Sequence, residues 1–200
     1  FVITMALSIP LGLVLALVRI SRLRSLSAAV GAYIWLMRGT PLMLQLLFIY
    51  FALPFVPVIG VRLPDFPSAV VAFALNYAAY FAEIFRAGLQ AVDKGQIEAA
   101  MALGLNGWQR FRHVRFPQAF RLILPPLGND FVAMVKDSSL VAVLGVTDVA
   151  QLAKVTAAGN FRYFETYNVA AFLYLVMTIG LSLMLRRFEA RMRSRGRDGS

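Results

Sequence analysis

Apolar runs about as long as a bilayer is thick dominate this sequence. The chain has 200 residues, of which 60% are hydrophobic and only 15% are charged, whereas soluble domains have about 45–50% apolar and about 25% charged residues. A helix needs about 20 apolar residues to cross the hydrocarbon core of a membrane. Because the apolar residues gather in runs of that length, the sequence predicts an all-α protein that crosses a membrane several times.

Five membrane-spanning helices are predicted, over residues 1–18, within 28–59, and over 68–85, 119–145 and 167–185. The second stretch is too long for one straight helix, because about 32 residues at 1.5 Å each give about 48 Å against a core of about 30 Å. We expect it to tilt, or to break at Arg38-Gly39-Thr40-Pro41. In the fourth predicted span, Pro125-Pro126 together with Gly128 predicts a kink in the helix. The first run is already apolar at Phe1, so we expect the native N-terminus to lie upstream.

Basic residues are unevenly distributed between the two sides of the predicted helices. Of the 20 lysines and arginines, fifteen follow the first, third and fifth spans, and the opposite loops carry three. Because Lys- and Arg-rich loops stay in the cytoplasm, this bias predicts an external N-terminus and a cytoplasmic C-terminus. It also accounts for the net charge of +10 without a nucleic-acid partner. We expect one transmembrane domain over residues 1–192 and a disordered basic tail over 193–200.

A polar, basic segment over residues 93–117 interrupts the apolar pattern between the third and fourth spans. Asp93 can cap a first helix, and Gly104 suits the left-handed position at its C-terminus. Asn106, with a glutamine three residues later, forms the capping-box pattern of a second helix. We expect Pro117 to end that second helix. The segment is therefore predicted to be a helix pair on the cytoplasmic side.

Two interpretations of this helix pair remain open from the residues alone. Glu98 offers a fixed carboxylate, and Ala99 and Ala100 let a partner approach closely, which favours docking of another protein. Alternatively, the pair is an amphipathic hairpin at the membrane surface, with Arg110 and Arg112 at anionic headgroups.

Polar residues at membrane depth are candidates for a ligand site, because they are costly there unless paired or facing water. Thr40-Pro41 is typical of a helix N-terminus. Such a terminus carries a partial positive charge and free N–H groups, so together with Arg38 it predicts a binding site for a carboxylate. The alternative places Arg38 at the cytoplasmic interface, in contact with phosphate. Asp137 and the serines after it are interpreted as contacts for a ligand's ammonium or polar side chain. The alternative is that Lys136 and Asp137 belong to an internal charge pair that holds helices together.

Asn76, Tyr80 and Glu83 share one stripe of the third predicted helix, because their spacing is i, i+4 and i+7. The stripe is predicted to line a pathway. For Glu83 an ion pair with Arg86 is slightly favoured over a ligand contact.

Several function classes are excluded. The sequence has no cysteine and one histidine, which leaves no metal site of Cys or clustered His. It lacks the G-x-x-x-x-G-K-[ST] loop that cradles ATP, and no nucleophile–base constellation is visible. We therefore expect neither an enzyme nor a cofactor-binding chain.

Residues 98–117 resemble the EAA loop of the permease subunits of ATP-binding-cassette (ABC) importers. The family pattern is E-A-A, three residues, G, nine residues, I, one residue, L-P. This sequence has Glu98-Ala99-Ala100, Gly104, Val114 and Phe116-Pro117 at the same spacing, with Val for Ile and Phe for Leu. The segments 38–42, 80–88 and 136–140 resemble the branch that carries polar amino acids such as histidine, glutamine, arginine and glutamate, and Gln45 belongs to the same pattern.

The resemblance covers about residues 30–190 and implies a type I importer in the bacterial inner membrane. It implies that separate ATPase subunits, holding ATP and Mg²⁺, dock on the segment through Glu98, Ala99, Ala100, Gly104, Arg110, Arg112 and Pro117. A second permease subunit, identical or related, and a periplasmic or lipid-anchored substrate-binding protein would complete the assembly. A polar amino acid would be bound by Arg38, Thr40, Gln45, Asn76, Tyr80, Glu83, Asp137, Ser138 and Ser139. The alternative function is a self-sufficient secondary carrier or channel, which predicts inverted repeats that are not visible here.

Overall fold

The computed structural model describes residues 1–57 and 60–194, and these form helices and the segments that connect them. The α-helices are α1 (Val2–Ile20), α2 (Arg24–Gly39), α3 (Leu42–Leu47), α4 (Asp65–Gln90), α5 (Lys94–Ala102), α6 (Gly107–Arg110), α7 (Phe116–Asp137), α8 (Val149–Asn160) and α9 (Tyr163–Ser194). π-helical turns follow α3 (Phe48–Ala52) and α6 (Phe111–Arg115), and 3₁₀ turns cover Leu53–Phe55 and Ser138–Leu144. The last two residues of the predicted second span, 58–59, and residues 195–200 of the predicted tail lie outside the described residues.

Among the described residues, three helices are long and apolar enough to cross a membrane: α1, α4 and α9. Two further pairs of consecutive helical segments could each form one bent span, which brings the number to as many as five. Helix α2 and residues 42–55 meet at an angle of 107°, and residues 107–144 and α8 meet at 51°. The expected break of the second span is therefore confirmed, and it lies between Gly39 and Leu42. The fifth span is longer than predicted, because α9 runs through the arginines after residue 185.

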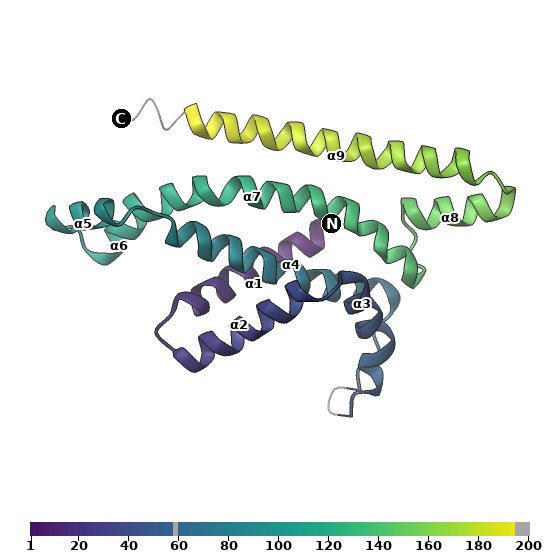
Figure 1. Ribbon diagram of the computed structural model, residues 1–200, viewed down its shortest axis with the longest axis horizontal. Coiled ribbons are helices and arrows are strands. Elements are labelled where there is room, and N and C mark those ends of the chain that lie inside the picture. The colour runs from purple at the N-terminus through teal and green to yellow at the C-terminus, as the bar shows by residue number, and fades with distance from the viewer. Residues whose placement is uncertain (58–59, 195–200) are drawn as a thin grey trace.

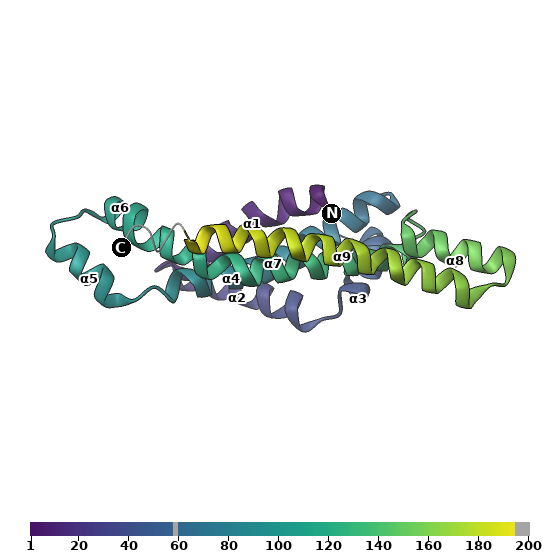
Figure 2. The same cartoon turned by 90° about the horizontal axis from the view of Figure 1, so that it is seen from above.

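The helices stack in layers, in the order α9, α7, α4 and α2 (Figure 1), and each layer contacts the next. Seen from above, α9 runs over α7 (Figure 2), which it contacts. Helix α4 is the centre of the core, since it also packs against α1 and α3. More than half of its residues are buried.

Small residues bring α1 and α4 into close contact. The buried face of α1 consists of Thr4, Ser8, Gly12 and Ala16, spaced four residues apart. At Gly12 a Cβ atom would lie 2.8 Å from the Cβ of Phe81 and 3.0 Å from the carbonyl oxygen of Ala78. Such stripes of small residues let membrane helices pack by van der Waals contact where lipid offers no hydrophobic driving force.

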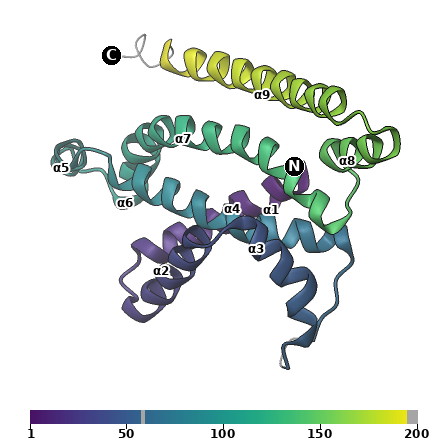
Figure 3. The same cartoon turned by 45° about the vertical axis from the view of Figure 1, so that its right-hand side comes forward.

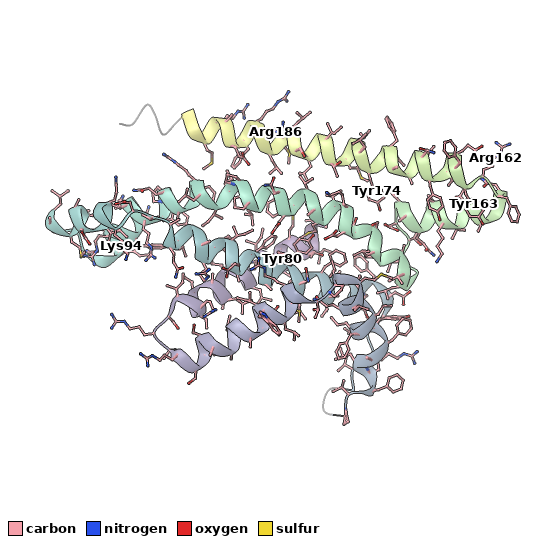
Figure 4. All side chains as sticks on the ribbon, in the orientation of Figure 1. Tyr80, Lys94, Arg162, Tyr163, Tyr174 and Arg186 are labelled. Carbon is pink, nitrogen blue, oxygen red and sulfur yellow. The ribbon has the colours of Figure 1, made fainter. Side chains whose placement is uncertain are left out.

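The segments that were predicted to share the basic side of the molecule lie together at one end of the fold. The α1–α2 turn, the α5–α6 segment and the C-terminal end of α9 lie toward the same side, at the left of Figure 1 and Figure 3. Helix α8 lies at the opposite side, with Arg162 there and Lys94 at the basic end (Figure 4).

Candidate functional site

The 93–117 segment forms the predicted helix pair, α5 and α6. Asp93 caps α5, because its carboxylate accepts a hydrogen bond of 3.2 Å from the backbone N–H of Gln96. Asn106 and Gln109 form a reciprocal capping box at the start of α6, with both bonds at 2.9 Å. Gly104 has a φ of +76°, in the left-handed region that glycine adopts most readily. These local predictions are confirmed.

The prediction that Pro117 ends the second helix is wrong. Helix α6 passes through the π-helical turn directly into α7, and Pro117 lies within the first turn of α7. In the π-helical turn, the N–H of Phe116 donates to the carbonyl of Phe111, five residues back. This wider turn shifts the register of the backbone hydrogen bonds at the start of α7, and Pro117, which has no N–H to donate, lies at that shift.

Exposed side chains cover the helix pair. Glu98 and Ala99 are exposed and Ala100 is buried against the fold. Two large apolar side chains are also exposed, Leu103 at 81% and Trp108 at 66%. Lys94 and Arg112 are exposed as well, so the segment offers acidic, basic and apolar side chains to whatever lies beyond it.

The segment is joined to the core by two hydrogen bonds. Arg115 donates from Nε to the carbonyl oxygen of Leu89 in α4 at 3.1 Å. Gln118 of α7 donates to Gln96 of α5 at 3.1 Å. The segment is therefore hydrogen-bonded to both α4 and α7.

A second feature is the elbow between α2 and α3, residues 39–41. Pro41 has no N–H, so the carbonyl of Met37, four residues earlier, lacks its helical partner. That carbonyl instead accepts hydrogen bonds from the side-chain amides of Gln45, at 2.9 Å, and Asn76, at 3.1 Å. Asn76 also donates to Gln45 at 3.0 Å and is 4% exposed. These two amides hold the bend against α4.

Thr40 does not cap α3 as predicted. Its hydroxyl donates backwards to the carbonyl of Leu36 at 2.8 Å, and no side chain caps α3. Pro41 is the residue before the helix rather than its first residue. The break leaves the Leu36 carbonyl near the end of α2 within reach of the hydroxyl, and this local bond wins over capping.

A cavity of about 480 Å³ lies between the elbow, α4 and α7, and we call it the central cavity. It is lined by Arg38, Gly39, Thr40, Pro41, Leu42, Asn76, Tyr77, Tyr80, Asp130, Ala133 and Asp137. Tyr80 lies near the middle of the molecule (Figure 4). The fold therefore brings together five residues of the predicted ligand site, Arg38, Thr40, Asn76, Tyr80 and Asp137.

Aromatic rings orient the charged side chains of the central cavity. The guanidinium carbon of Arg38 lies 5.2 Å from the centre of the Tyr80 ring, within the range of a cation–π contact. The hydroxyl of Tyr77 donates to Oδ2 of Asp137 at 2.7 Å. A cation and an anion thus face one cavity, each held by a tyrosine of α4.

Sequence reasoning missed Tyr77 and Asp130. Asp130 lines the central cavity, and its Oδ2 is buried without a hydrogen-bond partner. The available signal was its spacing, since Asp130 and Asp137 are seven residues apart and so share one face of α7. Tyr77, three residues before Tyr80, had the same kind of signal.

Other predicted ligand residues lie outside the cavity lining. Glu83 forms the ion pair with Arg86 that was slightly favoured. Ser138 and Ser139 donate to carbonyls of the preceding turn, each at 2.7 Å. Gln45 contributes to the elbow. Their part in ligand binding stays a prediction.

Similarity to known proteins extends over almost the whole chain. The sequence pattern of the family described as binding-protein-dependent transport system inner membrane component matches residues 8–194. The glutamine transport system permease protein GlnP of Escherichia coli K12 is 44% identical over 161 residues, 80% of this chain and 73% of GlnP. The arginine transport system permease protein ArtQ of Bacillus subtilis 168 is 38% identical over 193 residues, 96% of this chain and 87% of ArtQ.

Solved structures share the fold. A chain in the crystal structure of an amino acid ABC transporter with histidines superposes with a TM-score of 0.88 at 42% identity, covering 95% of this chain and 87% of that one. The inward-facing MetNI methionine ABC transporter gives a TM-score of 0.73 at 20% identity, over 96% and 88%. The second likeness concerns the fold alone.

Proposed function

This chain belongs to the family of inner membrane components of binding-protein-dependent transport systems, and on that premise we propose that it is the permease subunit of an ABC importer that carries a polar amino acid across the bacterial inner membrane. The relatives named above are permeases for glutamine or arginine. A self-sufficient secondary carrier is disfavoured, because a family of binding-protein-dependent systems works with separate components.

The observation that carries the proposal is the exposed helix pair α5–α6. ATPase subunits that bind ATP and Mg²⁺ dock on it, with Glu98, Leu103 and Trp108 in the contact. Arg115 joins the segment to the carbonyl of Leu89, so closure of the ATPase moves α4 and α7. The basic end of the molecule is then cytoplasmic, in agreement with the retention of Lys- and Arg-rich loops on that side.

The substrate is bound in the central cavity, which both α4 and α7 line. Its carboxylate is held by Arg38, because a guanidinium on an aromatic face is a fixed donor for carboxylate oxygens. A second permease subunit and a substrate-binding protein complete the importer. Motion of α4 and α7 therefore moves the residues that contact the bound amino acid.

The docking role is tested with Glu98→Lys. The reversed charge on the exposed helix pair is expected to lower co-purification of the ATPase about tenfold or more, as for a charge contact of an interface, and to abolish ATP-driven uptake. Co-purification and uptake of a labelled amino acid in proteoliposomes measure the two effects.

Glu165→Lys is the matched control, because it reverses an exposed acidic residue at the opposite end of the molecule. We expect it to leave ATPase association unchanged. If Glu98→Lys retains both ATPase association and uptake, docking on this segment is rejected.

A further inference from the structure

A groove of about 370 Å³ lies between α8 and α9, and we call it the α8–α9 groove. The two helices contact each other and are joined by a short turn at residues 161–162, so they run antiparallel (Figure 1). Ala153 and Ala170 line the groove and are buried, and their small side chains leave space between the two helices. Leu152 and Val169 also line it and are exposed. The groove is therefore apolar along its sides and open at the surface of the molecule.

The α8–α9 groove is about as long as one leaflet of a bilayer is thick. Arg162 and Leu173 both line it, and a helical rise of 1.5 Å per residue separates them by about 16 Å. Half of a hydrocarbon core of about 30 Å is about 15 Å. Because α9 is long and apolar enough to cross a membrane, the groove follows this helix from the membrane surface to about the middle of the bilayer.

Aromatic side chains place the turn between α8 and α9 at the membrane surface. Phe161 and Phe164 are 80% and 81% exposed, and Tyr163 and Tyr167 stack with their ring centres 6.4 Å apart. Tyrosine is enriched at the boundary between lipid and water. Phe161 also has a φ of +58°, which costs a bulky residue free energy, so the backbone holds an exposed ring at this turn. Arg162, which lies in the same turn (Figure 4), is therefore at the level of the lipid headgroups.

Two opposite charges lie at this end of the groove. Arg162 and Glu165 both line it and are exposed, and on a helix their spacing places the Cβ atoms about 5–6 Å apart. Within the part of the chain that the structure describes, the guanidinium of Arg162 and the carboxylate of Glu165 form no hydrogen bond or ion pair. A guanidinium binds phosphate oxygens through paired N–H donors, and a carboxylate accepts hydrogen bonds from an ammonium. The two side chains are therefore complementary to a headgroup with a phosphate and an ammonium a few bonds apart.

We propose that the α8–α9 groove binds one phospholipid with an ethanolamine headgroup, whose acyl chain lies along the groove, whose phosphate contacts Arg162 and whose ammonium contacts Glu165. The surrounding lipid is as apolar as the groove, so the headgroup contacts decide which lipid is bound. A second protein chain in the groove would have to bury both charges, which is costly, whereas a headgroup leaves them in contact with water. This inference goes beyond the proposed function, because it requires only that the chain spans a membrane and does not depend on the cargo.

Equilibrium binding of lipids to the assembled, delipidated transporter in detergent tests the proposed headgroup. The probes are radiolabelled phosphatidylethanolamine, phosphatidylcholine and phosphatidylglycerol with the same acyl chains. Phosphatidylcholine keeps the phosphate and the positive charge but has no N–H to donate, and phosphatidylglycerol has no positive charge. We expect phosphatidylethanolamine to bind about two- to fivefold more tightly than either of the others, as for a contact between exposed charges.

Two substitutions separate the roles of the charged side chains. Glu165→Gln is expected to remove the preference for phosphatidylethanolamine, because the ammonium loses its charged acceptor. Arg162→Gln is expected to weaken the binding of all three lipids by a similar factor, because all three carry the phosphate. Lys154→Gln is the matched control, since it removes an exposed positive charge of α8 that does not line the groove. It is expected to leave the binding of each lipid unchanged.

A second pair of variants tests whether the lipid lies in the groove. Thr156→Trp fills the groove and is expected to abolish saturable binding of all three lipids, whereas Val155→Trp, at the next and exposed position outside the lining, is expected to leave it intact. Equal binding of the three lipids, or an unchanged preference in Glu165→Gln, overturns the proposal. Separation of the permease subunits in Thr156→Trp would show that a second subunit covers the groove, and it overturns the lipid site as well. ATP-driven uptake of an amino acid tests the proposed function separately from all of these outcomes.

Discussion

Arg38 shows how a single charged residue is accommodated in an apolar chain. A guanidinium inside a membrane is costly unless it faces water or a partner. The guanidinium carbon of Arg38 lies 5.2 Å from the centre of the Tyr80 ring, and both side chains line the central cavity. The sequence pointed to both residues, but their contact depends on the packing of α2 against α4.

The contact between Arg38 and Tyr80 yields a prediction for uptake kinetics. Tyr80→Leu removes the ring and is expected to raise the KM of uptake by about 2- to 30-fold, which corresponds to a cation–π contact of about 0.5–2 kcal/mol, whereas Tyr80→Phe keeps the ring and a nearly normal KM. Arg38→Ala is expected to abolish uptake while ATPase association persists. Uptake in proteoliposomes at varied substrate concentration measures these effects, and an unchanged KM in Tyr80→Leu would contradict them.

At the scale of elements, prolines and small residues decide how helices meet. Pro41 frees the carbonyl of Met37, and amides from two other parts of the chain, Gln45 and Asn76, satisfy it. The break itself was predictable from the length of the apolar run. The pairing of Gln45 with Asn76 was not, because hydrogen bonds between residues 31 positions apart leave no local pattern.

The crossing of α1 and α4 yields a prediction for stability. In Gly12→Ala the added Cβ would lie 2.8 Å from Phe81 Cβ, which cannot rotate away, so the free energy of unfolding is expected to fall by about 1–3 kcal/mol through overpacking. At Gly159 nothing lies within 4 Å of the added Cβ. Gly159→Ala is therefore expected to be neutral or stabilising, by up to about 1 kcal/mol. Unfolding of the purified transporter in increasing denaturant compares the two, and equal stability would refute the close crossing.

At the scale of the whole molecule, the basic α1–α2 turn, the α5–α6 segment and the C-terminal end of α9 lie at one end of the stacked helices, with α8 at the other end (Figure 1). This arrangement predicts which residues can be reached from each side of the membrane. Because the chain has no cysteine, single cysteines can be introduced without removing others. We expect Arg162→Cys to react with an impermeant maleimide added to intact cells, and Arg112→Cys to react only after the membrane is opened. Labelling of Arg112→Cys in intact cells would show that the orientation is the opposite of the predicted one.

The sequence by itself determined the class of the protein, the positions of the apolar helices and the caps of α5 and α6, because these depend on composition and on residues a few positions apart. The resemblance of residues 98–117 to one family rested on local spacing as well. Only the tertiary structure decided which polar residues share the central cavity. Asp130 and Tyr77 line it, whereas Gln45 is bonded to Asn76 at the elbow. The physical reason is that burial and pairing of polar groups are set by helices from distant parts of the chain, so the energetic cost of each charge is known only once its neighbours are in place.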